Sequence, residues 1–573
     1  MNQPSPAIVA QGAVRRLPRL PLLLLCLAYV LPGFIGREPW KSADMTAFGH
    51  MAELLRTGTS NLSAWLHPTL LGQAADPDGP LPYWLGAWAM QVAPGWIAPD
   101  FAARLPFVLL LSLALFATWH GVYQLARSPG AQPVVFAFGG EARPADYARA
   151  VADGGLLALM GCLGLAQLSH ETTPALVQLC CSALLFYAAA AMVQPGILPT
   201  LAAFVGLFGL TLSGSPSIAL LLGTGAALWC RINQDHDGPA ALQRSLGGAT
   251  FALATLLAAL LAWHLDLWHW RIALPHARWI EWRNLGRLFL WFTWPAWPLV
   301  CWTLWQWRRQ LGQLLKHRHL AVPLVFAAVT VGATLTTPAY DRALLLALPA
   351  LAALAAFALP TLGRSVSALI DWFTLLFFTG CAIVIWMVWI AMQTGVPRQP
   401  AANVARLAPG FQPVFSWTAL LMALAATLAW IGLVKWRAGR HRAAIWKSVV
   451  LPASGATLCW LLLMTLWLPL LDFARSYAPL VQRVRDMVGQ PACVEVHGLS
   501  TAQAAAFQFH GQLVLRSAER KAQCQWLIVD TNATQSLPRA VDLRQWRLQT
   551  TVRRPSDNNE DIRLYRRVTP SGR

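Results

Sequence analysis

The sequence predicts an all-α polytopic membrane protein with a small α/β domain at its C-terminal end. Between residues 17 and 477, about thirteen apolar stretches of membrane-spanning length alternate with short loops. The composition is 56% hydrophobic and only 12% charged, whereas a soluble domain carries roughly a quarter charged residues. The loops expected on one side of the bilayer hold most of the Arg and Lys, as the positive-inside rule requires.

The formal charge of +19 could suggest a nucleic-acid partner. The basic residues, however, lie in short clusters between spans, where attraction to the anionic cytoplasmic surface of the membrane explains them. We therefore expect membrane lipids as partners and no nucleic acid.

The first apolar segment, residues 17–36, follows Arg15, Arg16 and Arg19. No small-residue cleavage site precedes Arg37, and further spans follow, so the segment is interpreted as a retained helix and not as a signal peptide. The predicted spans are 17–36, 102–126, 149–168, 172–193, 196–212, 215–231, 246–265, 287–307, 320–337, 342–359, 366–393, 414–435 and 447–473.

An odd number of spans places the two termini on opposite sides of the membrane. With the N-terminus in the cytoplasm of a bacterium, the basic clusters at 231–244, 308–318, 364 and 435–442 all fall inside. Changing the count by one span would move them outside. The sequence therefore predicts a bacterial inner (plasma) membrane protein with a periplasmic C-terminal domain.

Three regions are predicted outside. The first external loop, 37–101, contains two apolar stretches, 45–55 and 81–92, that are too short or broken to span and are typical of interfacial helices. The second region is a Trp-rich loop at 266–287, whose four Arg residues run against the positive-inside trend. The third is the tail, in which β-prone runs alternate with polar and Gly or Pro residues, as in a small α/β domain, at 493–497, 512–516, 525–529, 547–553 and 561–566. The predicted domains are thus 1–475 in the membrane and 476–573 in the periplasm.

Eight of the ten cysteines lie inside predicted spans and are interpreted as small apolar packing residues. Cys493 and Cys524 lie in the tail, where an oxidising periplasm would favour a disulfide between them. No Cys or His spacing predicts a metal site, and no Gly-rich phosphate loop follows a strand. We expect no cofactor; a divalent cation is the alternative, and no motif indicates one.

Several motifs resemble those of the membrane glycosyltransferases that use polyprenyl-phosphate-linked sugars, namely the aminoarabinose-transferase-like and protein O-mannosyltransferase-like family with the GT-C fold. In that family an acidic motif follows the first span, and an interfacial helix, a P-x-x-x-G turn and a K-P-P-L-x-Y-W element come next. The matching stretches here are REPWKSADMTAFGHMAELLRTG from Arg37, WLHPTLLG with Pro68 and Gly72, DGPLPYWLGA with Tyr83, and the shorter segments 103–106, 170–174, 294–299 and 340–349. The resemblance therefore covers nearly all of the membrane part.

The resemblance implies that Asp44 orients or deprotonates the acceptor hydroxyl or phosphate as the lipid phosphate leaves the sugar. The family's Asp-Glu pair becomes either Ala43-Asp44 or Asp44-Met45 here, and Asp44 is the acid in both registers. The alternative is that Asp44 caps the helix beginning near Met45, and both roles can hold together. Glu171 is the candidate second acid, the alternative being a loop residue that caps the next helix, and His170 beside it is interpreted as an ordinary polar residue.

Asp78 replaces the family's lysine that helps hold the donor phosphate, which either moves phosphate binding to other residues or marks a divergent member that lacks activity. Arginine suits bidentate phosphate contacts, although Arg beside Trp also anchors helices at the interface. The substrate-binding candidates are Arg271, Arg278, Arg283, Arg287, Arg342 and Tyr83.

The expected function is transfer of a sugar from a polyprenyl-phosphate carrier to a lipid, glycan or protein acceptor of the envelope on the periplasmic face. The main alternative is a non-catalytic member that binds a lipid-linked sugar or supports an assembly, which Asp78 and the lost Asp-Glu pair favour. A transporter is less favoured, because it would show internal repeats and interrupted helices with charges at the midplane, and neither is evident in the sequence.

Overall fold

The computed structural model describes residues 5–58, 62–75, 79–192, 196–232, 239–268, 278–337, 340–438 and 444–568. The chain divides into two compact units, each described separately. Unit 1 comprises Met1–Ile35, Pro106–Ile383 and Leu420–Thr465, and unit 2 comprises Gly36–Leu105, Val384–Ala419 and Leu466–Arg573.

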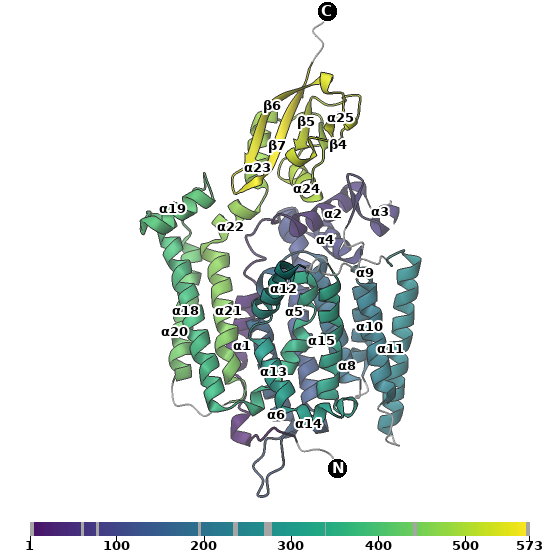
Figure 1. The fold of residues 1–573 in the computed structure, drawn as a ribbon, viewed down its shortest axis with the longest axis vertical. Helices are drawn as coiled ribbons and strands as arrows, with labels where there is room; N and C mark the ends of the chain where they lie inside the picture. The colour runs from purple at the N-terminus through teal and green to yellow at the C-terminus, as the bar shows by residue number, and fades with distance from the viewer. Residues whose placement is uncertain are drawn as a thin grey trace, which may run out of the picture. The chain divides into compact units, whose positions relative to one another are not determined.

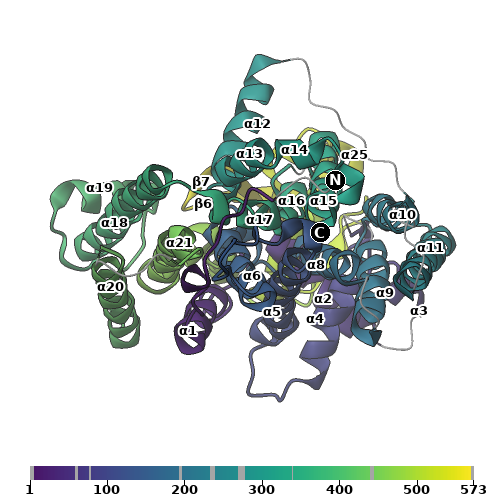
Figure 2. The ribbon, with the colours of Figure 1, turned by 90° about the horizontal axis from the view of Figure 1, so that it is seen from below.

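Unit 1 is helical (Figure 1). Its helices are α1 (Arg19–Val30), most of α5 (Pro99–Ala126), α6 (Pro144–Gly161), α7 (Leu165–Leu168), α8 (Pro174–Ala191), α9 (Ile197–Leu212), α10 (Pro216–Ile232), α11 (Pro239–His264), α12 (Trp279–Phe292), α13 (Ala296–Gln306), α14 (Arg308–Leu311), α15 (Arg318–Thr336), α16 (Tyr340–Leu345), α17 (Leu348–Ala356), and most of α18 (Arg364–Thr394), α20 (Trp417–Ala438) and α21 (Lys447–Leu466). Helices α8 to α11 lie side by side in both views (Figure 2).

Eight helical segments among the described residues are long and apolar enough to cross a membrane, so the chain is a multi-pass membrane protein. They are Pro99–Ala126, Pro174–Ala191, Ser245–His264, Arg318–Thr336, Asp341–Thr361, Arg364–Thr394, Trp417–Arg437 and Lys447–Leu466. Two shorter apolar helices, Arg19–Val30 and Ile197–Leu212, add to them. The total of thirteen spans stays a prediction.

The sequence predicted one continuous span at 287–307, and this was wrong. The structure has two helices there, α12 and α13, with a turn around Pro295, because proline has no backbone N–H to continue the helical hydrogen bonds. A second predicted span, 149–168, is also interrupted, between α6 and α7. The two interruptions are hydrogen-bonded to each other: the N–H groups of Leu163 and Gly164 donate to the carbonyls of Trp294 and Phe292 at 3.2 and 3.0 Å. Irregular backbone is tolerated at membrane depth where protein covers it in this way.

Unit 2 combines the loop that follows α1, for which the sequence predicts an external position, with the C-terminal region. The loop forms α2 (Ala43–Thr57), α3 (Leu62–Leu66), a short hairpin of β1 (Thr69–Leu70) and β2 (Gln73–Ala74), and α4 (Leu81–Val92). The remaining helices are α19 (Arg398–Leu407), α22 (Leu468–Arg475), α23 (Ala478–Val488), α24 (Thr501–Phe509) and α25 (Leu537–Ala540). The helices α2 and α24 pack so closely that a Cβ on Gly49 would lie 2.4 Å from the Cβ of Ala505.

The tail contains a five-stranded sheet in the order β4-β3-β5-β7-β6. Its strands are β3 (Val494–His497), β4 (Leu515–Ser517), β5 (Trp526–Asp530), β6 (Trp546–Arg554) and β7 (Asp557–Arg567). Strand β3 is parallel to β4 and β5, and β7 is antiparallel to β5 and β6. Strand β4 begins three residues later than predicted, because Gln512 has a positive φ of 52° and the Leu513 N–H donates to Phe507 at the end of α24. A disulfide joins Cys493 to Cys524, with the Cα atoms 5.4 Å apart.

Candidate active site around Arg37 and Asp44

A buried ion pair lies at the start of α2. Arg37 Nη2 is 2.9 Å from Asp44 Oδ2, and both side chains are 1% exposed. The same carboxylate oxygen accepts a hydrogen bond from the Trp40 backbone N–H at 3.1 Å. Asp44 lies in the first turn of the helix, where the helix dipole favours a negative charge. Asp44 therefore lies in the first helical turn, and its contacts to Arg37 and to the Trp40 N–H hold loop 37–44 against the start of the helix. The N-cap residue is Ser42 and not Asp44.

Trp40 connects this pair to α22. The Arg37 guanidinium carbon lies 4.5 Å from the centroid of the indole ring, and that of Arg475 lies 4.9 Å from it. Cation–π contacts of desolvated groups contribute about 2 kcal/mol. The indole Nε1 donates to Asp472 Oδ1 at 2.8 Å. Trp40 is 3% exposed, so the loop is held by aromatic, ionic and hydrogen-bonded contacts at once.

Asp472 is a further acid of this cluster. It follows the last membrane-spanning helix, and burial raises its pKa to about 7. The nearby Glu38 carboxylate also raises this pKa, whereas the Trp40 hydrogen bond and the Arg37 charge lower it. Arg104, which is 2% exposed, pairs with Asp100 at 3.2 Å and lies within electrostatic range of Arg37, Asp44 and Asp472. Carboxylates and guanidiniums therefore lie together in one cluster, in which the carboxyl group of Asp472 has a pKa near neutral pH.

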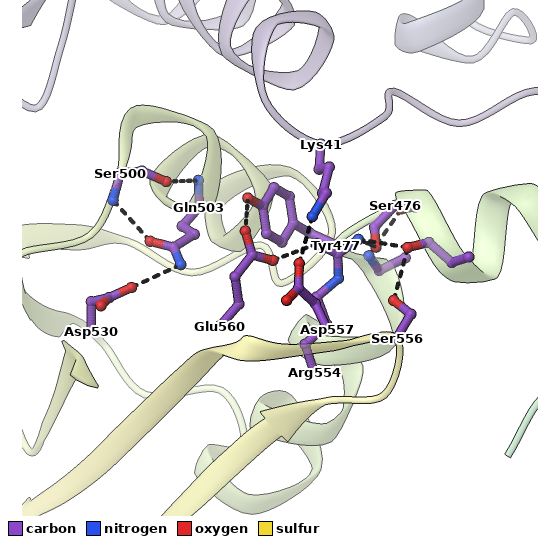
Figure 3. A network of polar contacts seen from close by, with 12 residues as sticks. Lys41, Ser476, Tyr477, Ser500, Gln503, Asp530, Arg554, Ser556, Asp557 and Glu560 are labelled. Carbon is purple, nitrogen blue, oxygen red and sulfur yellow. Dashed lines mark hydrogen bonds and ion pairs between the residues drawn. The ribbon is translucent and has the colours of Figure 1, made fainter. Parts of the chain in front are cut away.

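The turn between β6 and β7 anchors loop 37–44 to the C-terminal region (Figure 3). Lys41 Nζ contacts Asp557 Oδ2 at 2.7 Å, and the Lys41 N–H donates to the Arg475 carbonyl at 2.7 Å. Arg554 donates to the Ala474 carbonyl at 2.8 Å, pairs with Glu560 and covers the Tyr477 ring. The position of the candidate acid thus depends on residues more than 400 positions away.

Unit 1 contains a second pair of predicted residues. Glu171 Oε2 lies 3.0 Å from Arg342 Nη2, and its Oε1 accepts from Gln167 at 3.3 Å. The Glu171 side chain is 8% exposed and that of Arg342 is 33% exposed, so the arginine is the accessible partner.

His170 holds the loop beside Glu171 in place. It is fully buried, and its Nε2 lies 3.0 Å from the Tyr29 carbonyl. Its ring packs against Phe34 and Trp460, with centroids 4.9 and 4.6 Å apart. The sequence analysis interpreted His170 as an ordinary polar residue, and the structure shows it as a packed core residue.

The other candidates are dispersed. Arg278, Arg283 and Arg287 are exposed at the N-cap and along α12, where the last two share a face because they are four residues apart. Tyr83 is 1% exposed and packs against His50 between α2 and α4, with ring centroids 5.3 Å apart. Two predictions, for Arg271 and Asp78, lie outside the described residues.

The sequence analysis therefore predicted neither the Arg37–Asp44 nor the Glu171–Arg342 ion pair. It missed Arg37, Trp40 and Asp472, although the crowding of charged and aromatic residues at 37–44 was a signal. Asp44 and Glu171 belong to different units, and each is described within its own. Among the described residues, no three His, Cys, Asp or Glu side chains are grouped to hold a metal ion.

Comparisons with known proteins agree with this architecture. No family model matches the chain, and no curated protein matches it. Two solved structures of ArnT from Cupriavidus metallidurans, one apo and one bound to undecaprenyl phosphate, align over 96% of this chain and 98% of theirs. Each has a TM-score of 0.52 and 14% sequence identity. At this identity the likeness concerns the fold, and it extends over almost the whole of both chains. The resemblance in the sequence is thus confirmed at the level of architecture: this is a multi-pass membrane protein with the ArnT fold.

Proposed function

We propose that this chain is a glycosyltransferase of the bacterial inner membrane, which moves a sugar from a polyprenyl phosphate to an acceptor of the cell envelope on the periplasmic face. The observation that carries the proposal is the buried cluster around Arg37 and Asp44, which places a carboxylate beside guanidiniums in the first loop after span one. The match to an ArnT bound to undecaprenyl phosphate supports a polyprenyl-phosphate partner.

The chemistry requires two groups, and the cluster contains both. An acceptor hydroxyl or phosphate oxygen attacks the anomeric carbon, the bond from that carbon to the lipid phosphate breaks, and the configuration inverts. Asp44 receives the acceptor's proton or orients the acceptor, and guanidiniums neutralise the phosphate that leaves.

Asp44 is engaged by Arg37 in the described state. We therefore propose an exchange of partners during the reaction. The Arg37 guanidinium turns to the lipid phosphate, and the Asp44 carboxylate becomes available to the acceptor. Bidentate contacts make arginine a good phosphate ligand. Glu171 and Arg342 are proposed as a second acid and a second phosphate contact, and exposed Arg278 and Arg283 as further donor contacts.

The test is a comparison of cell-envelope lipids, glycans and glycoproteins, by mass spectrometry, from cells with and without the protein. A sugar that disappears with the protein, and returns with the wild-type chain but not with Asp44→Asn, identifies donor and acceptor together. An unchanged envelope would contradict the proposal.

The second candidate is a non-catalytic protein of the same architecture that binds a lipid-linked sugar. The complete burial of Asp44 in an ion pair favours it, because a general base must reach its substrate. If this second candidate function is correct, the chain binds a polyprenyl-phosphate-linked sugar, and Asp44→Asn leaves the composition of the envelope unchanged.

A further inference from the structure

An apolar groove in unit 1 is lined by residues of α1, α20 and α21. Figure 2 shows these three helices viewed along their length. Its volume is about 560 Å³, and its walls include Leu25, Trp430, Leu433, Val450 and Leu458, with Leu157 of α6 at its side. Leu24 lines the groove and is 55% exposed, so the groove opens to the surroundings of the helices. In a membrane, those surroundings are lipid chains.

The length of the groove along its helices is similar to the thickness of one membrane leaflet. It extends from Trp446, just before α21, to Leu461, which is a rise of about 22 Å, and from Ala426 to Trp436 on α20, which is about 15 Å. Half of the hydrocarbon core of a bilayer is about 15 Å thick. A lipid chain that enters at Trp436 would therefore be accommodated to its end.

Two tryptophans mark one end of the groove. The rings of Trp436 and Trp446 are stacked, with centroids 6.2 Å apart and an interplanar angle of 6°. Trp446 Nε1 donates to the Arg15 carbonyl at 2.8 Å, which fixes the N-terminal segment beside α21. Tryptophan is enriched at the level of the lipid headgroups, so this end of the groove is where a headgroup would lie.

This end of the groove is also positively charged. Lys447 Nζ lies 5.0 Å from the Trp436 ring centroid, and the lysine is only 6% exposed. Arg15 and Arg437 lie within electrostatic range of Lys447. Asp371 pairs with Arg437, so three cations and one acid leave a local charge of +2. An anionic headgroup complements this charge.

We propose that the groove binds one anionic glycerophospholipid of the surrounding membrane, with its phosphate at Arg15 and Lys447 and an acyl chain along α21. A polyprenyl phosphate fits less well, because its chain is much longer than one leaflet and the groove ends at Leu461. Basic pockets between helices are a common basis for binding anionic lipids. This site is independent of the transfer reaction proposed above.

Native mass spectrometry of the full-length protein tests the proposal. The protein is delipidated in mild detergent, incubated with phosphatidylglycerol, phosphatidylcholine and undecaprenyl phosphate at equal concentrations, and washed. One phosphatidylglycerol should remain bound. Each cation near an anionic headgroup contributes about 1 kcal/mol, so Arg15→Gln should weaken retention about 5-fold, and Arg15→Gln with Lys447→Gln about 30-fold.

Two further variants distinguish the contribution of the apolar groove to lipid retention from that of the positive charges. Ser454→Phe fills the groove and should abolish retention while leaving the charges in place. The double change Arg308→Gln with Arg309→Gln removes two charges outside the groove, in α14, and should leave retention unchanged. Arg15 is exposed, and its contact to Trp446 is made by the backbone, so Arg15→Gln keeps the test valid even if the Lys447 variant does not fold.

The proposal is overturned if Arg15→Gln retains phosphatidylglycerol as well as the wild type does. It is equally overturned if phosphatidylcholine is retained to the same extent, or if undecaprenyl phosphate displaces phosphatidylglycerol from the groove.

Discussion

The Arg37–Asp44 pair predicts that stability and activity can be separated by a double-mutant cycle. The two charged atoms are 2.9 Å apart, and both side chains are buried. At an effective dielectric constant of about 20, the attraction between them is about 6 kcal/mol. Removing one partner from a buried pair costs about 3–5 kcal/mol, because the other charge stays buried without compensation. Arg37→Gln and Asp44→Asn should each lower the stability by an amount in this range.

The double variant Arg37→Gln with Asp44→Asn should recover most of that loss. Two neutral amides need no counter-charge, and the side-chain amide oxygen that replaces the carboxylate can still accept the hydrogen bond from the Trp40 backbone. The transfer activity should not recover, because an amide cannot accept the acceptor's proton. Loss of a general base costs a factor of about 10² to 10⁴ in rate.

The assay combines the thermal unfolding midpoint of the detergent-purified protein with the amount of transferred sugar in the envelope. Glu53→Gln is the control, since Glu53 pairs with Arg56 on the same helix but is partly exposed, and the change should cost less than about 1 kcal/mol with no loss of transfer. Full activity of Asp44→Asn, or renewed activity in the double variant, would refute the catalytic role and leave Asp44 a purely structural acid.

Three other predictions follow from the structure. Burial raises the pKa of Asp472 to about 7, above its unfolded value of about 3.9, so the unfolded chain releases this proton first as the pH rises. This acid should therefore lower the stability by about 2 kcal/mol between pH 5.5 and 7.5, and the pH dependence of the unfolding midpoint should flatten in Asp472→Asn; equal slopes would contradict this. Replacing Cys493 and Cys524 by Ser should destabilise the tail by roughly 4 kcal/mol, since the disulfide joins residues 31 positions apart, and free-thiol labelling of both cysteines in the denatured, unreduced protein would argue against the bond. Alkaline phosphatase fused after Val481 should be active if the tail is periplasmic. An inactive fusion would mean that the number of spans differs from thirteen by an odd number.

Local patterns in the sequence determined much of the architecture. Hydropathy over about twenty residues predicts spans, and strict alternation predicts strands, because both reflect which side of an element meets an apolar environment. The predicted interfacial stretch 81–92 is helix α4 with the same bounds, and the five predicted β-prone runs all became strands. The two tail cysteines could be singled out because the remaining eight lie in apolar segments.

The pairing of the site residues was decided only by the tertiary structure. Trp40 and Asp472 are 432 positions apart, and Glu171 and Arg342 are 171 apart, so no local spacing relates them. The interruption at Pro295 is stable because another interrupted segment donates hydrogen bonds to its carbonyls, which is again a long-range condition. The sequence by itself therefore determined which segments are apolar and where an acid follows the first span. Packing determined which cation that acid meets, because the partner of a buried charge is set by the elements that exclude water around it.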